Sequence, residues 1–472
     1  MRHGRTHRTA ALAAALILLA SAGGCDGSSQ EDRSATKGKG KGKGKARPAS
    51  APDFDGDGYE DAAVVVTGSA AAGLDWDYGP VVVFRGGRDG LRPTGKPLIA
   101  GSGRRANGFL EEGFRSDLTA DLNSDGFSDL ILHQQVPVPN TQDNQERGGR
   151  TVVFHGGKDG LSTTPVRLHV PGDDPKHPFT AVEAADFDGD GHADLYGGER
   201  LLMGPFDADG KPKAARRLSG GMLSTAADFD RDGRTDLLVH RDYDEEAEDE
   251  RASRRSVRYF RGTPGQGLEE DGEVSRRLSE MVGDIGSEVH AGIDLDGDGY
   301  PDLLPPGWSA GHEREYVRGG PDGFRPGTTR LNVDLGSLTV GTHVLTGHVT
   351  SASDRNTVST VEYGSADQQG HLQLARLTSR GSAVTMTGLQ IIDRDTEGIS
   401  GDVFESDIGR RDRFAEDLRV LDADRDGHHD VLTFEPFSGP DGRYGGFWFL
   451  PGTPDGLRTR GVHRYTMPEL GL

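Results

Sequence analysis

The sequence predicts an all-β fold made of repeated four-stranded units, and three observations support this prediction. A nine-residue acidic motif occurs six times along the 472-residue chain. Short apolar segments rich in β-branched residues follow the motif, as is typical of β-strands. The motif also lies inside a larger repeat of about sixty residues, a period that indicates stacked or radially arranged units.

The acidic motif keeps a fixed pattern. It first reads DFDGDGYED, with acidic residues at positions one, three, five and nine. Glycine always occupies position six, and Asn123 is the single exception to the acidic pattern. The six copies lie at 53–61, 121–129, 186–194, 228–236, 294–302 and 422–430.

This spacing is the one expected of a loop wrapped around a hard cation. Calcium takes about six to eight oxygen ligands at about 2.3–2.6 Å, and alternate residues of a short loop can direct their side chains at one point. Glycine at position six permits the left-handed turn that such a loop needs. Position seven varies, as expected if only its backbone carbonyl is used. We therefore predict about six Ca²⁺ sites.

The predicted calcium ligands occupy positions one, three, five, seven and nine of each copy. In the first three copies they are Asp53, Asp55, Asp57, Tyr59, Asp61, Asp121, Asn123, Asp125, Phe127, Asp129, Asp186, Asp188, Asp190, His192 and Asp194. In the last three copies they are Asp228, Asp230, Asp232, Arg234, Asp236, Asp294, Asp296, Asp298, Tyr300, Asp302, Asp422, Asp424, Asp426, His428 and Asp430.

The residues after the motif distinguish it from an EF-hand. An EF-hand has a bidentate glutamate at position twelve of its loop and a helix on each side. No copy has a glutamate there, and strand-like apolar runs follow at 62–66, 130–133, 237–240 and 431–434. We therefore expect each ion at a corner between two strands.

The net charge of −22 is explained by the same motifs. Together the six copies hold 23 carboxylates, four in each copy less one for Asn123. A nucleic-acid-binding protein would present a basic face, and the folded part of this chain shows none. We therefore predict no nucleic-acid partner.

The first residues are predicted to be a signal peptide, residues 1–24. Arg2, Arg5 and Arg8 form a basic start, and the apolar run at 10–20 is too short to span a bilayer as a stable helix. Such a segment directs the chain out of the cytoplasm.

The only cysteine of the chain, Cys25, ends the small-residue run SAGGC. This run resembles the lipobox of bacterial lipoproteins, which implies lipidation of Cys25 and anchoring to the outside of the bacterial cell membrane. Ala22 replaces the more usual leucine, and simple secretion is the alternative. A secreted chain with one cysteine cannot form an internal disulfide, so the thiol needs another use.

Residues 25–50 are predicted to be a flexible tether. The segment is polar and contains KGKGKGKGK at 37–45. Its glycines do not form a phosphate loop, because no strand precedes them and no helix follows. The lysines could also lie against anionic lipid or a cell-wall polymer.

A larger unit surrounds each acidic motif in residues 51–472. A short apolar segment enters the motif, a second strand leaves it, a third ends in a glycine-rich turn, and a fourth closes the unit. The turn reads FRGGRDGL, FHGGKDGL and VRGGPDGF in three of its copies.

One unit is predicted to have lost its acidic set. The interval between the motifs at 294 and 422 is about twice the usual one. The segment 349–364 fits the register, with Ser351, Ser353 and Asp354 in place of the acidic residues. Strands at about 371–378 and 383–392 would complete the unit.

Seven four-stranded units repeated radially describe a seven-bladed β-propeller with calcium loops, because closure of the ring removes free strand edges. Six blades remain possible if 340–392 is an insertion. A calcium β-roll repeats every nine residues, not every sixty or so. A string of independent modules would need linkers, which the sequence lacks.

The acidic motif, the strand that follows it and the GG-x-D-G-L turn together resemble the FG-GAP/VCBS repeat of integrin α-type propellers. The resemblance covers nearly all of the chain after residue 50. It implies a seven-bladed propeller with calcium between the first and second strands of each blade. The chain departs from the family in its short third unit and its altered sixth unit, and it lacks the integrin α-type legs and transmembrane helix.

No catalytic constellation is recognisable, since neither a G-x-S-x-G nor an H-E-x-x-H motif occurs. We expect a non-enzymatic, monomeric, calcium-binding module that binds an extracellular protein or glycan and is tethered to the membrane. The alternatives are a propeller enzyme acting on an extracellular glycan or polymer and a structural subunit of a surface complex.

The ligand is predicted to bind on the face formed by connections between second and third strands. These connections vary in length and composition, and exposed aromatic residues are favoured contacts. The alternative is that the aromatic residues pack over the blade ends. The predicted contact residues are Trp76, Tyr78, Trp308 and Tyr444.

Overall fold

A computed structural model provides the structure of the chain. It describes residues 52–67, 78–100, 105–106, 109–110, 113–137, 147–173, 178–218, 223–241, 256–282, 290–304, 313–334, 343–361, 370–399, 404–406, 409–411, 414–435 and 445–472. The predicted signal peptide, Cys25 and the tether lie outside these residues.

The described strands form six sheets of three or more strands and three two-stranded hairpins. The eight-stranded sheet consists of two antiparallel groups of four strands, and we therefore name seven units in chain order, units 1 to 7. Unit 1 contains β1 (Ala62–Val65), β2 (Val81–Arg85) and β3 (Arg92–Pro93); unit 2, β6 (Phe114–Ala120), β7 (Asp129–Pro137), β8 (Arg147–Phe154) and β9 (Val166–Arg167); unit 3, β10 (Glu183–Ala185), β11 (Asp194–Gly197), β12 (Arg200–Met203) and β13 (Ala214–Arg217). Unit 4 contains β14 (Leu223–Ala227), β15 (Asp236–Arg241), β16 (Ser256–Thr263) and β17 (Gly267–Glu270).

The remaining units follow the same order. Unit 5 contains β18 (His290–Ile293), β19 (Asp302–Leu304), β20 (Glu313–Gly320) and β21 (Gly323–Asp334); unit 6, β22 (His343–Gly347), β23 (Arg355–Val361), β24 (His371–Arg380) and β25 (Ala383–Ile392); unit 7, β28 (Asp417–Leu421), β29 (Asp430–Glu435), β30 (Gly446–Leu450) and β33 (Arg464–Thr466). Short hairpins pair β4 (Arg105–Ala106) with β5 (Phe109–Leu110), β26 (Phe404–Ser406) with β27 (Gly409–Arg411), and β31 (Gly452–Thr453) with β32 (Gly456–Leu457).

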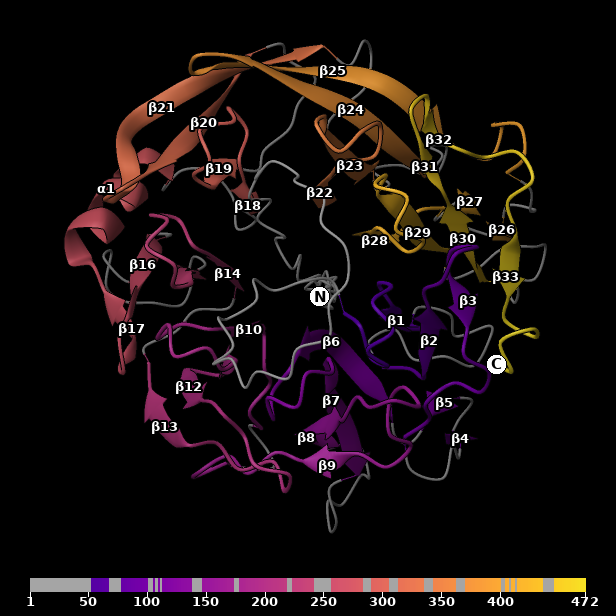
Figure 1. The fold of residues 1–472 in the computed structure, drawn as a ribbon, viewed down its shortest axis with the longest axis horizontal. Coiled ribbons are helices and arrows are strands. Elements are labelled where there is room, and N and C mark those ends of the chain that lie inside the picture. Colours follow the sequence, from indigo (N-terminus) through magenta and orange to yellow (C-terminus); the bar gives the residue numbers. More distant parts are fainter. Residues whose placement is uncertain are drawn as a thin grey trace, which may run out of the picture.

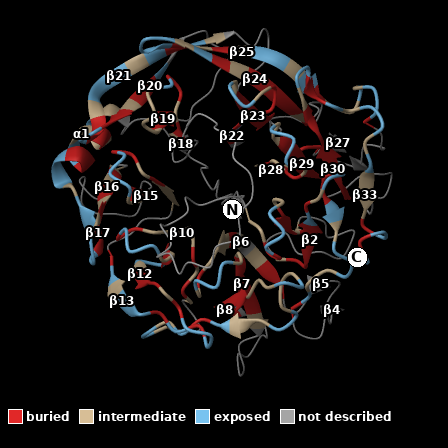
Figure 2. Ribbon diagram, in the orientation of Figure 1, coloured by how far each residue is buried: buried red, intermediate tan, exposed pale blue. Residues whose placement is uncertain are grey.

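The units lie around a central axis in chain order (Figure 1). In units 2 to 7 the first strands are innermost, and each contacts the next along the series β6, β10, β14, β18, β22 and β28. Apolar clusters fill the space between neighbouring units; Phe187 and Tyr196 of unit 3, for example, share a cluster with Leu237 and Phe260 of unit 4. The buried residues accordingly lie between the sheets, and the outer strands carry most of the exposed ones (Figure 2).

The last unit packs against the first, so the ring of units is closed by side chains. Phe84 of β2 lies in one cluster with Phe434 and Phe447 of unit 7. The Phe84 and Phe447 rings are 5.1 Å apart between centroids, and Tyr465 lies 5.6 Å from Phe84. The Tyr465 hydroxyl also donates a hydrogen bond to the Leu91 carbonyl at 2.8 Å. We refer to this junction of units 7 and 1 as the seam.

The strands predicted after the acidic motifs are present as β1, β7, β15 and β29. Their runs of valine, leucine and isoleucine are apolar on both faces because each sheet is covered on both sides by its neighbours. In β29 and β30 every residue is buried. The sequence pattern and the packing therefore agree in these strands.

The strands predicted for the altered unit are also present, as β24 and β25. One feature was not predicted: β25 pairs in parallel with β21, from Leu331 opposite Val384 to Asp334 opposite Thr387. Units 5 and 6 therefore form one eight-stranded sheet.

One helix, α1 (Gly272–Val282), departs from the all-β prediction. The Asp271 carboxylate caps its start by accepting hydrogen bonds from the backbone N–H groups of Glu273 and Val274 at 3.2 and 3.0 Å. Val274 and Leu278 lie one turn apart and pack into the cluster between units 4 and 5. Among the described residues, no helix has the length and apolar composition needed to cross a bilayer.

The seam predicts a large stability loss on truncation of its central ring. Phe84 is fully buried, so Phe84→Ala removes its contacts with Phe447 and Tyr465 and leaves a cavity. We expect the free energy of unfolding, measured by urea denaturation, to fall by about 3–5 kcal/mol. Ile99→Ala is the control, because this side chain is 49% exposed. An equally small effect for both variants would contradict closure of the ring by this cluster.

Candidate metal-binding site

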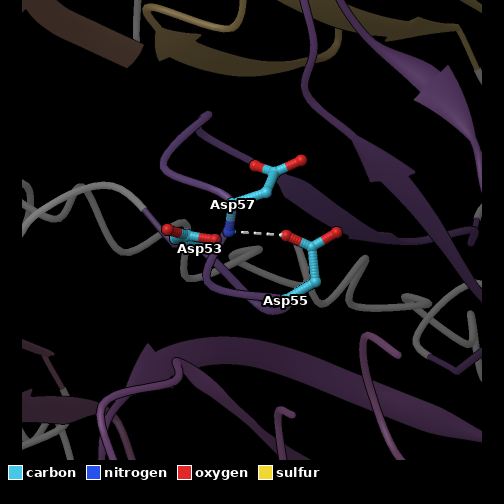
Figure 3. Close-up of side chains that lie close together, drawn as sticks. All are labelled: Asp53, Asp55 and Asp57. Atoms are coloured by element: carbon cyan, nitrogen blue, oxygen red, sulfur yellow. Dashed lines mark hydrogen bonds between the residues drawn. The ribbon is translucent and has the colours of Figure 1, made fainter. Parts of the chain in front are cut away.

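In units 2, 3, 4, 5 and 7 the acidic motif lies in the loop between the first and second strands, as predicted. In unit 1 the motif directly precedes β1, and β1, β2 and β3 correspond to the second, third and fourth strands of the other units. We number these loops by unit, loops 1 to 5 and 7. In loop 1 the side chains of Asp53, Asp55 and Asp57 converge (Figure 3). One carboxylate oxygen from each lies within 4.8 Å of the others. The loop is held in shape partly by the Asp57 N–H, which donates to Asp55 Oδ1 at 3.0 Å.

Four other loops show the same convergence with a consistent difference. Loop 7 brings together positions one, three and five, as loop 1 does. Loops 3, 4 and 5 instead bring together positions one, three and nine. The converging residues are Asp422, Asp424 and Asp426; Asp186, Asp188 and Asp194; Asp228, Asp230 and Asp236; and Asp294, Asp296 and Asp302.

Loop 2 is the copy with an amide at position three. Asn123 Nδ2 donates a hydrogen bond to Asp125 Oδ2 at 3.0 Å, and Asn123 Oδ1 accepts one from the Asp125 N–H, also at 3.0 Å. Asp121 accepts the N–H groups of Asp125 and Gly126, at 3.1 and 2.9 Å. The loop therefore has the same backbone shape with one fewer charge.

The glycine predicted to take a left-handed turn does so. At position six the φ angles lie between 86° and 93°, as at Gly58 and Gly126. Position four is left-handed too, which the sequence analysis did not anticipate. It is glycine in three loops, but Ser124, Arg231 and Arg425 hold φ values of about 58–60° there.

The ninth-position aspartate ties the loop to the third strand of its unit. In loop 1, Asp61 accepts the Phe54 N–H at 2.7 Å and the Gly86 N–H at 2.8 Å. The corresponding acceptors in the other loops are Asp129, Asp194, Asp236, Asp302 and Asp430, each bonded to the second residue of its loop and to a glycine of the third strand or just after it. These six aspartates are at most 3% exposed.

In loops 1, 3, 4, 5 and 7, burial strongly disfavours the charged form of the ninth-position carboxyl. It raises the pKa of Asp61, Asp194 and Asp236 to about 7 and the pKa of Asp302 and Asp430 to about 8. The backbone N–H donors lower these pKa values without offsetting the burial. A positive charge beside each carboxylate would favour its ionised form.

The first glycine of the repeated turn is required by a close approach of two chain segments. A Cβ atom at Gly86 would lie 2.3 Å from the Glu60 carbonyl oxygen, and one at Gly156 would lie 2.2 Å from that of Ser128. Only glycine therefore lets the acidic loop lie against the third strand.

Neighbouring loops interlock through positions seven and four. The position-seven side chain of one loop reaches position four of the preceding loop. Phe127 packs on Gly56, where a Cβ would lie 2.7 Å from its ring. Tyr300 lies under the Arg231 guanidinium at 5.8 Å. The position-seven side chain thus has a packing role in addition to the backbone carbonyl predicted as a ligand.

Histidines at position seven also contact the preceding loop, His192 at position four and His428 at position two. His192 Nδ1 lies 2.6 Å from Ser124 Oγ in the preceding loop. His428 Nδ1 lies 3.0 Å from the Val349 carbonyl oxygen of unit 6. Both histidines therefore serve contacts between loops.

The interlock continues across the seam. The Arg425 guanidinium lies 5.7 Å from the centre of the Tyr59 ring. Glu60 accepts a hydrogen bond from the Asp422 N–H at 2.6 Å. In addition, the Gly87 N–H donates to the Ala423 carbonyl at 2.9 Å. Loops 7 and 1 are therefore in direct contact although they are more than 360 residues apart.

Basic side chains of the protein pair with several of the predicted ligands. Arg85 Nε lies 2.5 Å from Asp55, and Lys213 Nζ lies 2.8 Å from Asp190. In loop 4, Arg261 pairs with Asp230 and Arg234 with Asp232. In loop 5, Arg318 pairs with Asp296 and Asp298, and Arg325 pairs with Asp298.

The corresponding loop of unit 6 lies one residue earlier than predicted. Gly347, the last residue of β22, pairs with Asn356, which is the register of the ninth position in the acidic loops. The loop is therefore 348–356, and its positions one, three, five and nine are His348, Thr350, Ala352 and Asn356, rather than the predicted set of Ser351, Ser353 and Asp354.

Asn356 shows what replaces the buried aspartate when the other carboxylates are missing. It is fully buried, accepts the Thr350 N–H at 3.1 Å and donates to the Ala375 carbonyl at 3.5 Å. A neutral amide thus also links the loop to the third strand, but it accepts the position-three N–H and donates to a carbonyl. Among the described loops, a buried aspartate occupies position nine only where positions one and five are also acidic.

The donor set of the acidic loops fits a calcium ion. Carboxylate and carbonyl oxygens are the ligands that calcium prefers, and several of them converge in each loop. Loop 7 adds a specific observation: Asp422 Oδ1 is buried and has no hydrogen-bond donor among the described residues. A buried carboxylate oxygen without a donor is costly unless a cation lies beside it.

Three of the four predicted ligand-contact residues, Trp76, Trp308 and Tyr444, lie outside the described residues. Tyr78 is half-buried. Its ring lies under the Arg115 guanidinium at 5.2 Å and 6.2 Å from the His133 ring. The Tyr78 ring therefore packs against side chains of unit 2.

The innermost strands carry a separate polar cluster near the central axis. Arg419 of β28 pairs with Asp117 of β6 at 2.5 Å and with Asp417 at 2.6 Å. Glu183 of β10 accepts a hydrogen bond from the Ser224 hydroxyl of β14 at 3.0 Å, and burial raises the pKa of Glu183 to about 8. These contacts join the inner strands of different units.

The structure and its loops define a protein built mainly of repeated antiparallel β-strand units, six of which carry an acidic loop. The family model described as an FG-GAP-like repeat matches residues 121–197, from loop 2 to the end of β11. The chain therefore contains an FG-GAP-like repeat at residues 121–197. A search of curated proteins finds none that matches it.

The interlock between loops 1 and 2 can be tested at Gly56. Gly56→Ala meets both a left-handed φ of 72° and the Phe127 ring, whereas Gly172 has a φ of 69° and open space around it. We expect Gly172→Ala to cost about 1–2 kcal/mol of unfolding free energy. Gly56→Ala should cost about 1–3 kcal/mol more, because the ring must move. Equal losses in urea denaturation would show that Phe127 does not press on this position.

Proposed function

We propose that the protein is a calcium-stabilised, seven-bladed β-propeller that binds a protein or glycan partner outside the cell, without catalysing a reaction. The observation that carries the calcium assignment is the convergence of three carboxylates in five loops of the ring. The FG-GAP-like repeat at 121–197 supports the propeller and the binding role.

In this proposal the calcium ions are structural. The carboxylates at positions one, three and five would hold the ion, with the position-seven carbonyl and the ninth aspartate completing its environment. Calcium supplies the positive charge that the converging carboxylates require. The chain supplies the loop geometry, the N–H donors and the tie to the third strand.

Mass action sets the size of the calcium contribution. Extracellular calcium modules bind at about 10⁻⁴–10⁻³ M, so each site adds roughly 0.4–1.4 kcal/mol at about 1 mM calcium. Six sites together would supply about 2–8 kcal/mol, a large share of the roughly 5–15 kcal/mol by which a domain is stable. Calcium removal should therefore affect the entire fold.

Chelation is expected to lower the melting temperature by many degrees, because six sites lose their ion together. Asp190→Ala should lower it less, since only loop 3 is changed. Asp89→Ala is the control, an exposed aspartate outside the loops whose partner is Arg92. Elemental analysis should find about six calcium ions, with none from unit 6. An unchanged melting temperature in excess chelator would show that calcium does not stabilise the fold.

We further propose that the partner binds the face opposite the acidic loops. The loops and the glycine-rich turns lie together at one edge of each sheet, as the bond between Asp61 and Gly86 illustrates. Connections between second and third strands lie at the other edge, because consecutive strands are antiparallel. Trp76, Trp308 and Tyr444 belong to those connections.

Alanine substitution of Trp76, Tyr78, Trp308 and Tyr444 is expected to weaken partner binding at least several-fold. The assay would measure binding to cell-wall glycans and secreted proteins. Asp89→Ala and Lys158→Ala are matched controls, because both residues are exposed in glycine-rich turns on the other face. If the controls abolish binding and the aromatic substitutions do not, the assignment of faces is reversed.

We also propose that Cys25 is lipidated and that residues 25–50 tether the propeller to the bacterial cell membrane. The sequence before and around Cys25 supports this, as the only thiol of the chain follows an apolar segment and a small-residue run.

Cys25→Ser is expected to release the protein into the medium or to leave an unprocessed precursor, because the acceptor of the lipid is gone. Cell fractionation with immunodetection measures this. Membrane association and normal maturation of the variant would show that the anchor lies elsewhere.

A further inference from the structure

The acidic loops differ in how far the protein's own basic side chains already neutralise them. This difference follows from the residue that precedes the glycine at the end of the third strand. That residue is Arg85, Arg261 and Arg318 in units 1, 4 and 5, and Pro451 in unit 7. An arginine there reaches the acidic loop of its own unit, and a proline cannot.

Loop 5 is the most heavily neutralised loop. Arg318 Nε lies 2.6 Å from Asp296, and its second nitrogen lies 2.8 Å from Asp298. Arg325 of β21 adds a contact of 2.9 Å to Asp298. The side chain of Arg318 is only 19% exposed, so its charge is held in place. Position five of this loop is accordingly absent from the cluster of converging oxygens.

Loop 7 is the opposite case. Among the described residues, no basic side chain forms an ion pair with Asp422, Asp424 or Asp426. Their carboxylate oxygens lie within 4.8 Å of one another, and Asp422 Oδ1 is buried without a donor. Arg425, within the same loop, is directed to the Tyr59 ring across the seam. The charge of loop 7 is therefore left for an external cation.

Loops 3 and 4 support the same relation between pairing and convergence. Asp190 and Asp232, at position five, pair with Lys213 and Arg234. In both loops position five is missing from the converging set, as it is in loop 5. In loops 1 and 7, where the described residues provide no such partner, position five belongs to the set.

We propose that the acidic loops fill in a fixed order, with loop 7 as the tightest cation site and loop 5 as the weakest, because arginines of the chain occupy loop 5. This inference rests on the calcium binding proposed above and adds a ranking of the sites. Ligand charge is a main determinant of calcium affinity in oxygen-ligand loops. A cation entering loop 5 has to displace Arg318 and Arg325 or bind beside them.

The ranking places the first ion at the seam. Loop 7 contacts loop 1 through the bonds from Asp422 N–H to Glu60 and from Gly87 N–H to the Ala423 carbonyl. An ion that orders loop 7 therefore also orders the junction between the two ends of the ring. Occupation of loop 5, far from the seam, has no such effect.

Calorimetric titration of the calcium-free full chain with Ca²⁺ tests the ranking. We expect one ion to bind about tenfold or more tightly than the rest. Asp426→Asn should abolish this first phase. Asp298→Asn is the matched control, the same change at the same motif position in loop 5, and it should leave the first phase intact. Melting curves with excess calcium check that both variants fold.

Two further measurements give site-specific readouts. Arg318→Gln with Arg325→Gln should raise the number of tightly bound ions from one to two, and Arg325→Gln alone, at a 40% exposed side chain, should tighten loop 5 to a smaller extent. Hydrogen exchange at one equivalent of Ca²⁺ should first protect the amides of 422–430 and of Gly87, and leave 294–302 unchanged.

The outcomes separate this inference from calcium binding itself. Six equivalent sites, or loss of the first phase in Asp298→Asn but not in Asp426→Asn, would overturn the ranking and leave calcium binding intact. A wild-type chain that binds no calcium would overturn both.

Discussion

Like charges held close together are the constraint on which the rest of this structure depends. Five loops each keep three carboxylate oxygens within 4.8 Å of one another. At about 4 Å two such charges repel by roughly 4 kcal/mol in an environment of effective dielectric constant 20. Backbone N–H donors and basic side chains of the protein offset part of this repulsion. In the function proposed above, a bound cation meets the remaining charge. Unit 6 has the neutral Asn356 at the corresponding buried position.

The sequence predicted the parts of the fold that are local. Strands after each acidic motif are present because runs such as AAVV and DVLTFE are apolar on both faces. The left-handed glycine at position six is also present, because any loop that folds back over its own carboxylates needs it. These features depend on residues only a few positions apart.

Features that depend on distant contacts were not predictable in this way. The parallel pairing of β21 with β25 follows from the extra length of β21, which no local pattern marks as different from an ordinary fourth strand. The loop of unit 6 was misplaced by one residue because its acidic markers are missing. Its position is fixed only by the pairing of Gly347 with Asn356. A signal for α1 was available, since Asp271 precedes apolar residues at helical spacing, but the surrounding β pattern obscured it.

The contacts between positions seven and four have a consequence for how the ring can change. An acidic loop contacts the preceding loop through position seven and the following loop through position four, and the two contacting residues are matched in size. Phe127 requires a glycine at position four of loop 1, whereas Tyr300 packs on Arg231 at position four of loop 4. Units that look alike by their acidic motifs are therefore not interchangeable. Duplication or exchange of a unit by recombination would set Phe127 against an arginine or leave Arg425 without its ring. The residues at positions seven and four therefore restrict which unit can follow which along the chain.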